Sequence, residues 1–237
     1  MVYKMVNLQL QELNFTLLTK DFNPAIFTLT TLQNNAIIQS DLELAENPIY
    51  SNSGVKYVFN NQIRLIAQPH RIIFAETINN KRLQDIHLPK IVSKCLQTFT
   101  QIDCQAFSIK PSGYAPFNSD LEARKYMSQG LLAFNSWQKL QNREISAVGL
   151  KLAYPYKTGN FHLDINQANV EVSGRQIPAV WFAGNFIYQL SGQDSTERQS
   201  HMNMVLDWQS DIQNFQDFIN NELLAPSILP SPNLFPL

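Results

Sequence analysis

Apolar and polar residues alternate along much of the first third of the chain, a pattern typical of strands with one buried face. The segments LNFTLLTK (13–20) and PAIFTLTTL (24–32) are rich in β-branched and aromatic residues. Residues 56–78 hold three more short apolar runs, separated by Asn60-Asn61 and Pro69-His70, which favour turns. The pattern predicts β structure in both early segments, followed by an antiparallel meander of three strands.

From Leu88 the spacing of the apolar residues changes to three and four, which indicates one amphipathic helix. Pro89 suits its first turn, and its buried stripe is predicted to be Leu88, Ile91, Val92, Cys95, Leu96, Phe99 and Ile102. Residues 104–117 return to an extended pattern, which is predicted to stop at Pro111, Gly113 and Pro116.

A second helix is predicted to begin at Ser119, because Ser119 and Glu122 have the spacing of a capping box. Its expected buried side consists of Leu121, Met127, Leu131, Phe134 and Leu140. Residues 144–190 then predict three long strands, joined by turns at KTGN (157–160) and SGRQ (173–176).

The last helix has the clearest pattern. Asp194 or Ser195 is a suitable N-cap, and apolar residues recur at four and three along one side: Val205, Trp208, Ile212, Phe215 and Ile219. The opposite side is predicted to be an acidic, solvated surface carrying Asp207, Asp211, Asp217 and Glu222.

The strand AVWFAGNFIYQL (179–190) contains an unusual glycine, Gly184, between aromatic residues. Alternation places Val180, Phe182, Gly184, Phe186, Tyr188 and Leu190 on one face, and Trp181, Ala183, Asn185, Ile187 and Gln189 on the other. A glycine in a strand often marks the close approach of another element. We therefore expect an aromatic ring of the last helix, from Trp208 or Phe215, to fill the notch at Gly184.

These elements predict an α+β protein in which antiparallel meanders are each packed by amphipathic helices. Strands followed by a helix occur in each half, which favours two related sheet-plus-helix lobes from a degenerate duplication, although residue identities do not support it. One continuous two-layer domain is the alternative. The expected divisions are a β-rich lobe at 1–116, a second lobe at 117–225, and a Pro-rich apolar tail at 226–237.

Composition narrows the function classes. The formal net charge is −1 and Lys and Arg form no long run, which argues against a nucleic-acid partner. No stretch reaches the length of a membrane span, and the first residues lack a signal-peptide pattern. With only two cysteines, Cys95 and Cys104, in a chain of this size, we expect a cytoplasmic protein without disulfides.

The sequence supports no catalytic, cofactor-binding or metal-binding assignment. The four histidines, His70, His87, His162 and His201, lack the spacing of a zinc or helical metal site. His162, Asp164 and Asn166 share one strand face and suit a solvated surface or a ligand site. An enzyme or small-molecule binder with a cleft between lobes near His162, Asp164 and Tyr156 is the alternative hypothesis.

The leading hypothesis is a non-catalytic binding or assembly protein with a protein partner or self-association. The mixed apolar and amide surface of Trp181, Asn185 and Ile187 is one candidate contact. The tail is another, because its four prolines exclude a helix while Leu234 and Phe235 are apolar. Whether enzyme activity is present stays open, with the sequence favouring its absence.

Overall fold

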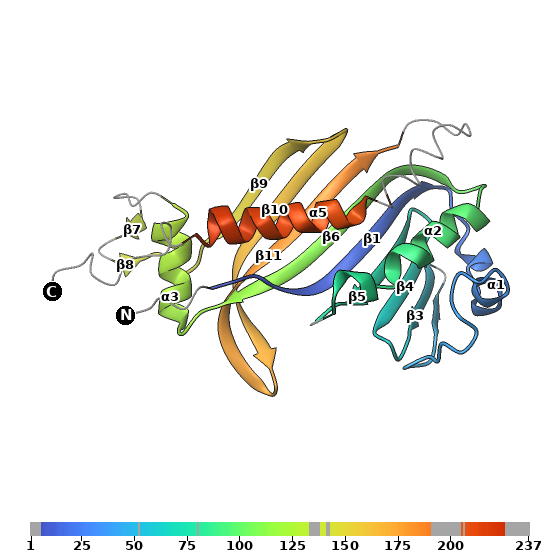
Figure 1. Cartoon of the computed structure of the whole chain (residues 1–237), viewed down its shortest axis with the longest axis horizontal. Helices are drawn as coiled ribbons and strands as arrows, with labels where there is room; N and C mark the ends of the chain where they lie inside the picture. The colour runs from blue at the N-terminus through green and yellow to red at the C-terminus, as the bar shows by residue number, and fades with distance from the viewer. Residues whose placement is uncertain are drawn as a thin grey trace.

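The computed structural model describes residues 6–51, 53–79, 81–132, 138–140, 143–190, 205 and 207–225. Nine strands form one antiparallel sheet in the order β2-β3-β4-β5-β1-β6-β11-β10-β9 (Figure 1). Their bounds are β1 (Gln9–Lys20), β2 (Ile49–Ser51), β3 (Gly54–Val58), β4 (Ile63–Gln68), β5 (Arg71–Thr77), β6 (Asp103–Pro116), β9 (Gly149–Tyr156), β10 (Gly159–Val172) and β11 (Arg175–Gln189). A separate two-stranded ribbon pairs β7 (Lys139–Leu140) with β8 (Arg143–Glu144).

The described helices lie between these strands and after them. They are η1 (Pro24–Ile26), α1 (Leu29–Asn34), η2 (Leu83–Asp85), α2 (Leu88–Thr98), α3 (Asp120–Lys125) and α5 (Trp208–Asp217). One π-helical turn, η3 (Tyr126–Gly130), continues α3, and another, η5 (Phe218–Leu223), continues α5. In Figure 1, α2 and α5 both cross in front of the sheet.

The centre of the sheet is the antiparallel pair of β1 and β6, which joins the two halves of the chain. Phe15 lies opposite Ile109 and Leu17 opposite Phe107, and all four side chains are buried. The outer neighbour of β1 is β5, and the outer neighbour of β6 is β11. The α+β class with antiparallel strands is therefore confirmed, but the meanders that the sequence predicted as separate sheets form one sheet.

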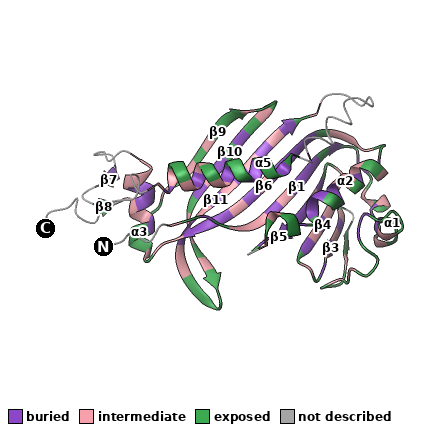
Figure 2. Cartoon of the chain, in the orientation of Figure 1, coloured by how far each residue is buried: buried purple, intermediate pink, exposed green. Residues whose placement is uncertain are grey.

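Burial alternates along much of β1 and β11 and identifies the face that the helices cover (Figure 2). In β11, Val180, Phe182, Gly184, Phe186 and Tyr188 are buried, whereas the residues that alternate with them are half-buried. The same alternation in β1 buries Leu13, Phe15 and Leu17. These side chains belong to one hydrophobic cluster that also contains the buried residues of α1, α2 and α5.

The notch at Gly184 is filled by α5, as the sequence predicted. A Cβ atom at Gly184 would lie 2.8 Å from Cδ2 of Phe215 and 3.2 Å from Cε2 of Phe161. Phe215 is fully buried and packs edge-on against Phe161, with 6.5 Å between ring centroids. Because Gly184 has no side chain, Phe215 can pack against β11 at this position, and this determines how closely α5 approaches the sheet.

Most predicted elements appear where the pattern put them. The three strands in 56–78 are β3, β4 and β5, and the three strands in 144–190 are β9, β10 and β11. The helix from Leu88 is α2, which ends at Thr98. In the last helix, Val205, Trp208, Ile212, Phe215 and Ile219 are all buried. The predicted caps of that helix, Asp194 and Ser195, lie outside the described residues.

The prediction of β structure in PAIFTLTTL is wrong, because side-chain caps start two short helices there. Asn23 Oδ1 accepts from the backbone N–H of Ala25, and η1 begins at Pro24. Thr28 Oγ1 accepts from the backbone N–H of Thr31 at the start of α1. Local capping thus outweighs the β propensity of the threonines.

The second predicted helix is shorter than its apolar pattern suggested. Its cap is confirmed, since Ser119 Oγ accepts from the backbone N–H of Glu122. However, α3 gives way to the π-helical turn η3, which ends at Gly130 and changes the residues that face inward. Leu121 is 51% exposed, contrary to the prediction. Leu140 lies in β7, and Phe134 lies outside the described residues.

The strand 104–117 was also predicted to be interrupted at Pro111 and Gly113, but β6 continues through both to Pro116. Pro111 lies opposite Leu13 of β1, and Gly113 lies opposite Phe182 of β11. The register of β6 is therefore maintained by its two neighbouring strands.

The packing at Gly184 gives a stability prediction. We expect Gly184→Val to lower the free energy of unfolding by about 1 to 3 kcal/mol, because the new side chain overpacks against Phe215. Urea denaturation measures the change. Ala183→Val, on the half-buried opposite face of the same strand, is the matched control and should have a smaller effect. Equal unfolding free energies for wild type and Gly184→Val would contradict this packing account.

Candidate functional site

The side chains that point away from the helices form what we term the open face of the sheet. No described α-helix packs against it, because the buried apolar residues of α1, α2, α3 and α5 all belong to the cluster on the other face. Its central members are half-buried or polar, in contrast to the buried aromatic and aliphatic side chains on the face that the helices cover. They are Asn14, Thr16 and Leu18 of β1, Ser108, Lys110 and Ser112 of β6, Trp181, Ala183, Asn185 and Ile187 of β11, and His162, Asp164 and Asn166 of β10.

Three of the predicted contact residues lie together on this face. Trp181, Asn185 and Ile187 are each half-buried and occupy alternate positions along β11. The strand is long enough to hold them in line because it pairs with β6 on one side and β10 on the other. The two other predicted contact residues, Leu234 and Phe235, lie outside the described residues.

A hollow of about 230 Å³ opens on this face beside Asn185. Asn185 lies opposite His162 in the β10–β11 register, and Asp164 lies opposite Ala183. The hollow is lined by Lys151, Leu152, Ala153, His162, Asp164, Ala183 and Asn185. The strand pairing therefore places His162, Asp164 and Asn185 on the same side of the hollow. The sequence pattern assigned His162 and Asp164 to one strand and Asn185 to another, without relating them.

The amide oxygen of Asn185 is the most informative atom in this hollow. Oδ1 is inaccessible to solvent, yet it accepts no hydrogen bond from the described part of the chain. A buried acceptor without a donor is destabilising by about 1 to 3 kcal/mol. By contrast, Lys151 and Asp164 form a long ion pair of 4.0 Å at the rim. A molecule bound in the hollow could therefore satisfy this acceptor only after the Asn185 amide turns toward the hollow.

A larger hollow of about 550 Å³ lies at the other end of the central strands. There β10 and β11 extend beyond their neighbours as an arm, in which Asn169–Val172 pair only with Arg175–Pro178 (Figure 1). The arm residues Glu171, Val172 and Ser173 form one wall, and Ile78, Lys81 and Leu83 form another. The cations here are engaged, since Lys81 pairs with Glu76 at 2.8 Å and Arg82 with Asp85 at 2.8 Å.

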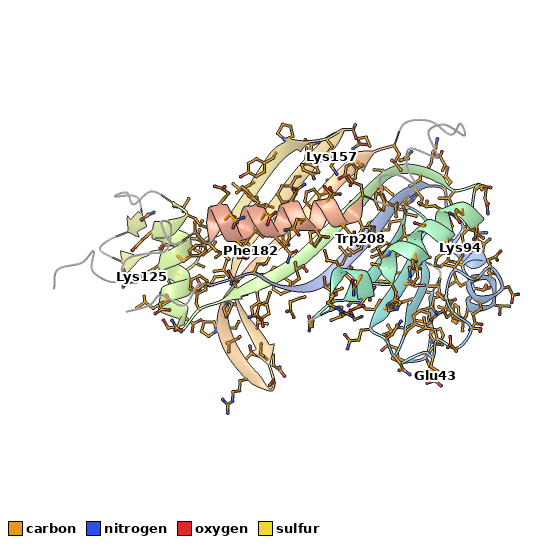
Figure 3. The ribbon with its side chains drawn as sticks, viewed as in Figure 1. Glu43, Lys94, Lys125, Lys157, Phe182 and Trp208 are labelled. Atoms are coloured by element: carbon orange, nitrogen blue, oxygen red, sulfur yellow. The ribbon has the colours of Figure 1, made fainter. Side chains whose placement is uncertain are left out.

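The most concentrated set of ionisable groups lies on the helix side, around Asp211 of α5. Asp211 is fully buried, and its Oδ1 accepts from Tyr156 Oη at 2.9 Å and from Lys157 Nζ at 2.8 Å. Its Oδ2 accepts from Tyr188 Oη at 2.5 Å. Lys157, which Figure 3 labels, lies at the turn between β9 and β10 and also contacts Asp207. The sequence prediction that Asp211 lies on a solvated face is therefore wrong.

The surroundings of Asp211 set the protonation of its partners. Burial, reinforced by the hydrogen bond to Asp211, raises the pKa of Tyr188 well above its ordinary value of 10.0. Burial opposes the charge of Lys157, but hydrogen bonds to Asp207 and Asp211 outweigh it and raise the pKa of Lys157 above 10.5. Each donor is held protonated by the carboxylate, so the cluster fastens α5 to β9 and β11.

A second buried carboxylate, Glu76 of β5, has a similar structural role at α2. Its Oε2 accepts from the backbone N–H groups of His87 and Leu88, both at 2.9 Å, at the start of the helix. A carboxylate at a helix N-terminus satisfies free N–H groups and interacts favourably with the helix dipole. Lys81 neutralises the same carboxylate from the solvent side.

The two cysteines do not offer a reactive thiolate. Burial raises the pKa of Cys95 above its ordinary value, and burial also raises the pKa of Cys104, to about 12. Both thiols are unbridged. Within the described ranges, no cluster of three or more His, Cys, Asp or Glu side chains has a geometry suited to a metal ion.

The cleft of the enzyme hypothesis is not assembled as expected. His162 and Asp164 line the small hollow on the open face, whereas Tyr156 lies on the helix side and bonds to Asp211. The burial of Asp211 did have a sequence signal. It lies three residues after Trp208 and four before Phe215, so it occupies a position within the apolar stripe.

No protein-family model matches the chain, and a search of curated protein sequences finds no significant match. None of the described helices combines the length and the apolar character that crossing a membrane requires.

The Asp211 cluster predicts how stability changes at alkaline pH. The folded chain retains the protons of Tyr188 and Lys157 to higher pH than the unfolded chain, because both pKa values are raised. Their stabilising contribution is complete below pH 10.0 and declines as pH rises above it. We expect Tyr188→Phe to lower the unfolding free energy by about 1.5 to 3 kcal/mol at pH 8 and to flatten its decline above pH 10.

Urea denaturation between pH 8 and pH 11 measures both effects. Tyr154→Phe is the control, since the Tyr154 ring is 38% exposed and lies on the neighbouring edge strand. Parallel pH profiles for wild type and Tyr188→Phe would show that Asp211 does not hold the Tyr188 proton.

Proposed function

We propose that this chain is a binding or assembly protein that recognises a protein partner through the open face of its sheet. The observation that supports the proposal is the unsatisfied Oδ1 of Asn185, set between half-buried apolar side chains. The Asn185 amide turns toward the surface when the partner binds, and a hydrogen bond donated by the partner then removes the desolvation cost of that oxygen. Trp181 and Ile187 provide apolar area on either side of it, the combination found at the centres of protein interfaces.

The buried carboxylates favour binding over catalysis. Asp211 and Glu76 are both fully buried, but each is occupied by hydrogen bonds that fix a helix to the sheet. A catalytic carboxylate needs access to a substrate proton. The polar residues that do reach a hollow, His162 and Asp164, suit recognition of a polar group on the partner.

A small-molecule ligand is the second candidate, since the hollow of about 230 Å³ has a volume suited to a small polar compound. It would use the same Asn185 oxygen, with His162 and Asp164 as further contacts. The proposed cytoplasmic location suits both candidates, because Cys95 and Cys104 are unbridged thiols.

We also propose that the two halves of the fold derive from a degenerate duplication. Each half begins with a long strand, continues with a short helix and a meander, and ends with an amphipathic helix. In each half the last meander strand returns beside the first, so that β5 lies next to β1 and β11 next to β6. The sequence pattern predicted the division at residue 116, whereas this repeat assigns β6 to the second half.

Photo-crosslinking tests the proposed binding surface. A benzoylphenylalanine at Gln189, exposed on the open face of β11, should capture a specific protein in the native cell. The same group at Gln213, exposed on α5, should not. Asn185→Leu should weaken the affinity for the purified captured protein about fivefold or more, since a hydrogen bond contributes roughly 1 kcal/mol.

Asn221→Leu, an exposed amide on the helix side, is the matched control and should retain full affinity. Thermal unfolding must show that Asn185→Leu remains folded. Equal affinity of wild type and Asn185→Leu for the captured protein would exclude the open face as the contact. A small molecule that co-purifies with wild type and is lost from Asn185→Leu would favour the second candidate.

A further inference from the structure

The positive charges of the open face differ in whether they have a carboxylate partner. Lys56 pairs with Glu46 at 3.1 Å, Arg64 pairs with Glu12, and Lys151 pairs with Asp164 at 4.0 Å. Lys20 lies opposite Asp103 in the register of β1 and β6. Arg71 and Lys110, which lie between these pairs near the middle of the sheet, have no carboxylate within 4.0 Å in the described part of the chain.

Strand register fixes the surroundings of Lys110. On β1 its neighbour is Asn14, and on β11 the pairing of Ile109 with Phe186 places Asn185 beside it. Along β6 itself, Ser108 and Ser112 lie two residues away on the same face. Lys110 is therefore flanked by amides and hydroxyls, and the unsatisfied Asn185 oxygen belongs to the same group.

Arg71 approaches the same area from β5, where it lies opposite Leu18 of β1. Its Nε donates to Gln68 Oε1 at 2.5 Å, which leaves the guanidinium charge uncompensated. Between Arg71 and Lys110 lie Thr16 and Ser108, which are opposite each other in the β1–β6 register. Both are buried, at 4% and 7% exposure, and neither hydroxyl forms a hydrogen bond within the described residues.

The charge of Lys110 is in an unfavourable environment. Burial, and after it the repulsion from Arg71, lowers the pKa of Lys110 below its ordinary value of 10.5. Two cations close enough to repel, with two free hydroxyl donors between them, form an arrangement that an anion would stabilise. Leu18, which is 45% exposed, and half-buried Ile73 border this area and offer apolar contact to the same ligand.

We propose that Arg71, Lys110, Thr16 and Ser108 form an anion subsite of the open face, which binds a carboxylate from an acidic segment of the protein partner. This inference rests on the proposed function and specifies the chemistry of the partner. A peptide carboxylate fits better than a nucleic acid, because the subsite itself contains only two cations, Arg71 and Lys110. Nucleic-acid binding depends on neutralising many phosphates along a strand.

Nuclear magnetic resonance titration of the full chain tests the subsite. The probe is the hexapeptide acetyl-Glu-Leu-Glu-Leu-Glu-Glu-amide, and the matched probe has Gln at every Glu position. We expect the acidic probe to give saturable amide shifts at Thr16, Ser108 and Lys110, and to weaken as NaCl is raised. The Gln probe should bind about tenfold less tightly or not measurably, because it lacks the charge-assisted hydrogen bonds.

Lys110→Gln should weaken the acidic probe about tenfold, and Arg71→Gln should have a similar effect. Lys94→Gln removes an exposed lysine from α2 on the helix side, where Figure 3 labels it, and should leave the affinity unchanged. Equal binding of the acidic and Gln probes, or equal affinities of wild type and Lys110→Gln, would overturn the subsite.

A six-nucleotide single-stranded DNA tests the alternative anion. If it displaces the acidic probe and binds more tightly to the same residues, the assignment to an acidic peptide is wrong. If Lys110→Gln does not change probe binding but Asn185→Leu still reduces crosslinking at Gln189, the subsite is wrong and the proposed function stands. If the acidic probe still binds but Asn185→Leu leaves crosslinking at Gln189 unchanged, the protein-binding function is wrong and the subsite stands.

Discussion

The antiparallel pairing of β1 with β6 is the contact on which the remainder of this structure depends. It brings Phe15, Leu17, Phe107 and Ile109 together at the centre of the sheet, and it places β5 and β11 on opposite sides of that centre. Without it, each half would present a strand edge with unpaired backbone groups. With it, the chain has one hydrophobic cluster, to which α1, α2 and α5 all contribute.

One face of this sheet is covered by helices, and polar contacts within the apolar layer fix their positions. Glu76 holds the start of α2, while Asp211 and its three donors hold α5, whose approach to β11 depends on the missing side chain at Gly184. The opposite face has no such layer among the described elements. It carries an unsatisfied amide oxygen at Asn185 and the neighbouring cations Arg71 and Lys110, which have no carboxylate within 4.0 Å among the described residues, and these groups favour recognition of another molecule.

The sequence predicted much of the fold because its patterns are local. The alternation in β11 and the spacing of Trp208, Ile212 and Phe215 were sufficient to predict that an aromatic ring of α5 fills the notch at Gly184. Strand register was not predictable, because it depends on pairing between distant segments. The grouping of Asn185 with His162, and of Lys110 with Asn14, is therefore visible only in the sheet. Capping at Thr28 and the π-helical turn at Tyr126–Gly130 likewise changed elements that propensity alone had assigned.

Native-state hydrogen exchange measures most directly whether the β1–β6 pair unites the two halves. We expect the backbone amides of Phe15 and Leu17 in β1 and of Phe107 and Ile109 in β6 to exchange only through global unfolding. Their opening free energies should be equal to one another and to the unfolding free energy from denaturation. Two distinct opening free energies, one for β1 with β5 and another for β6 with β11, would show that the halves unfold independently and would contradict the account.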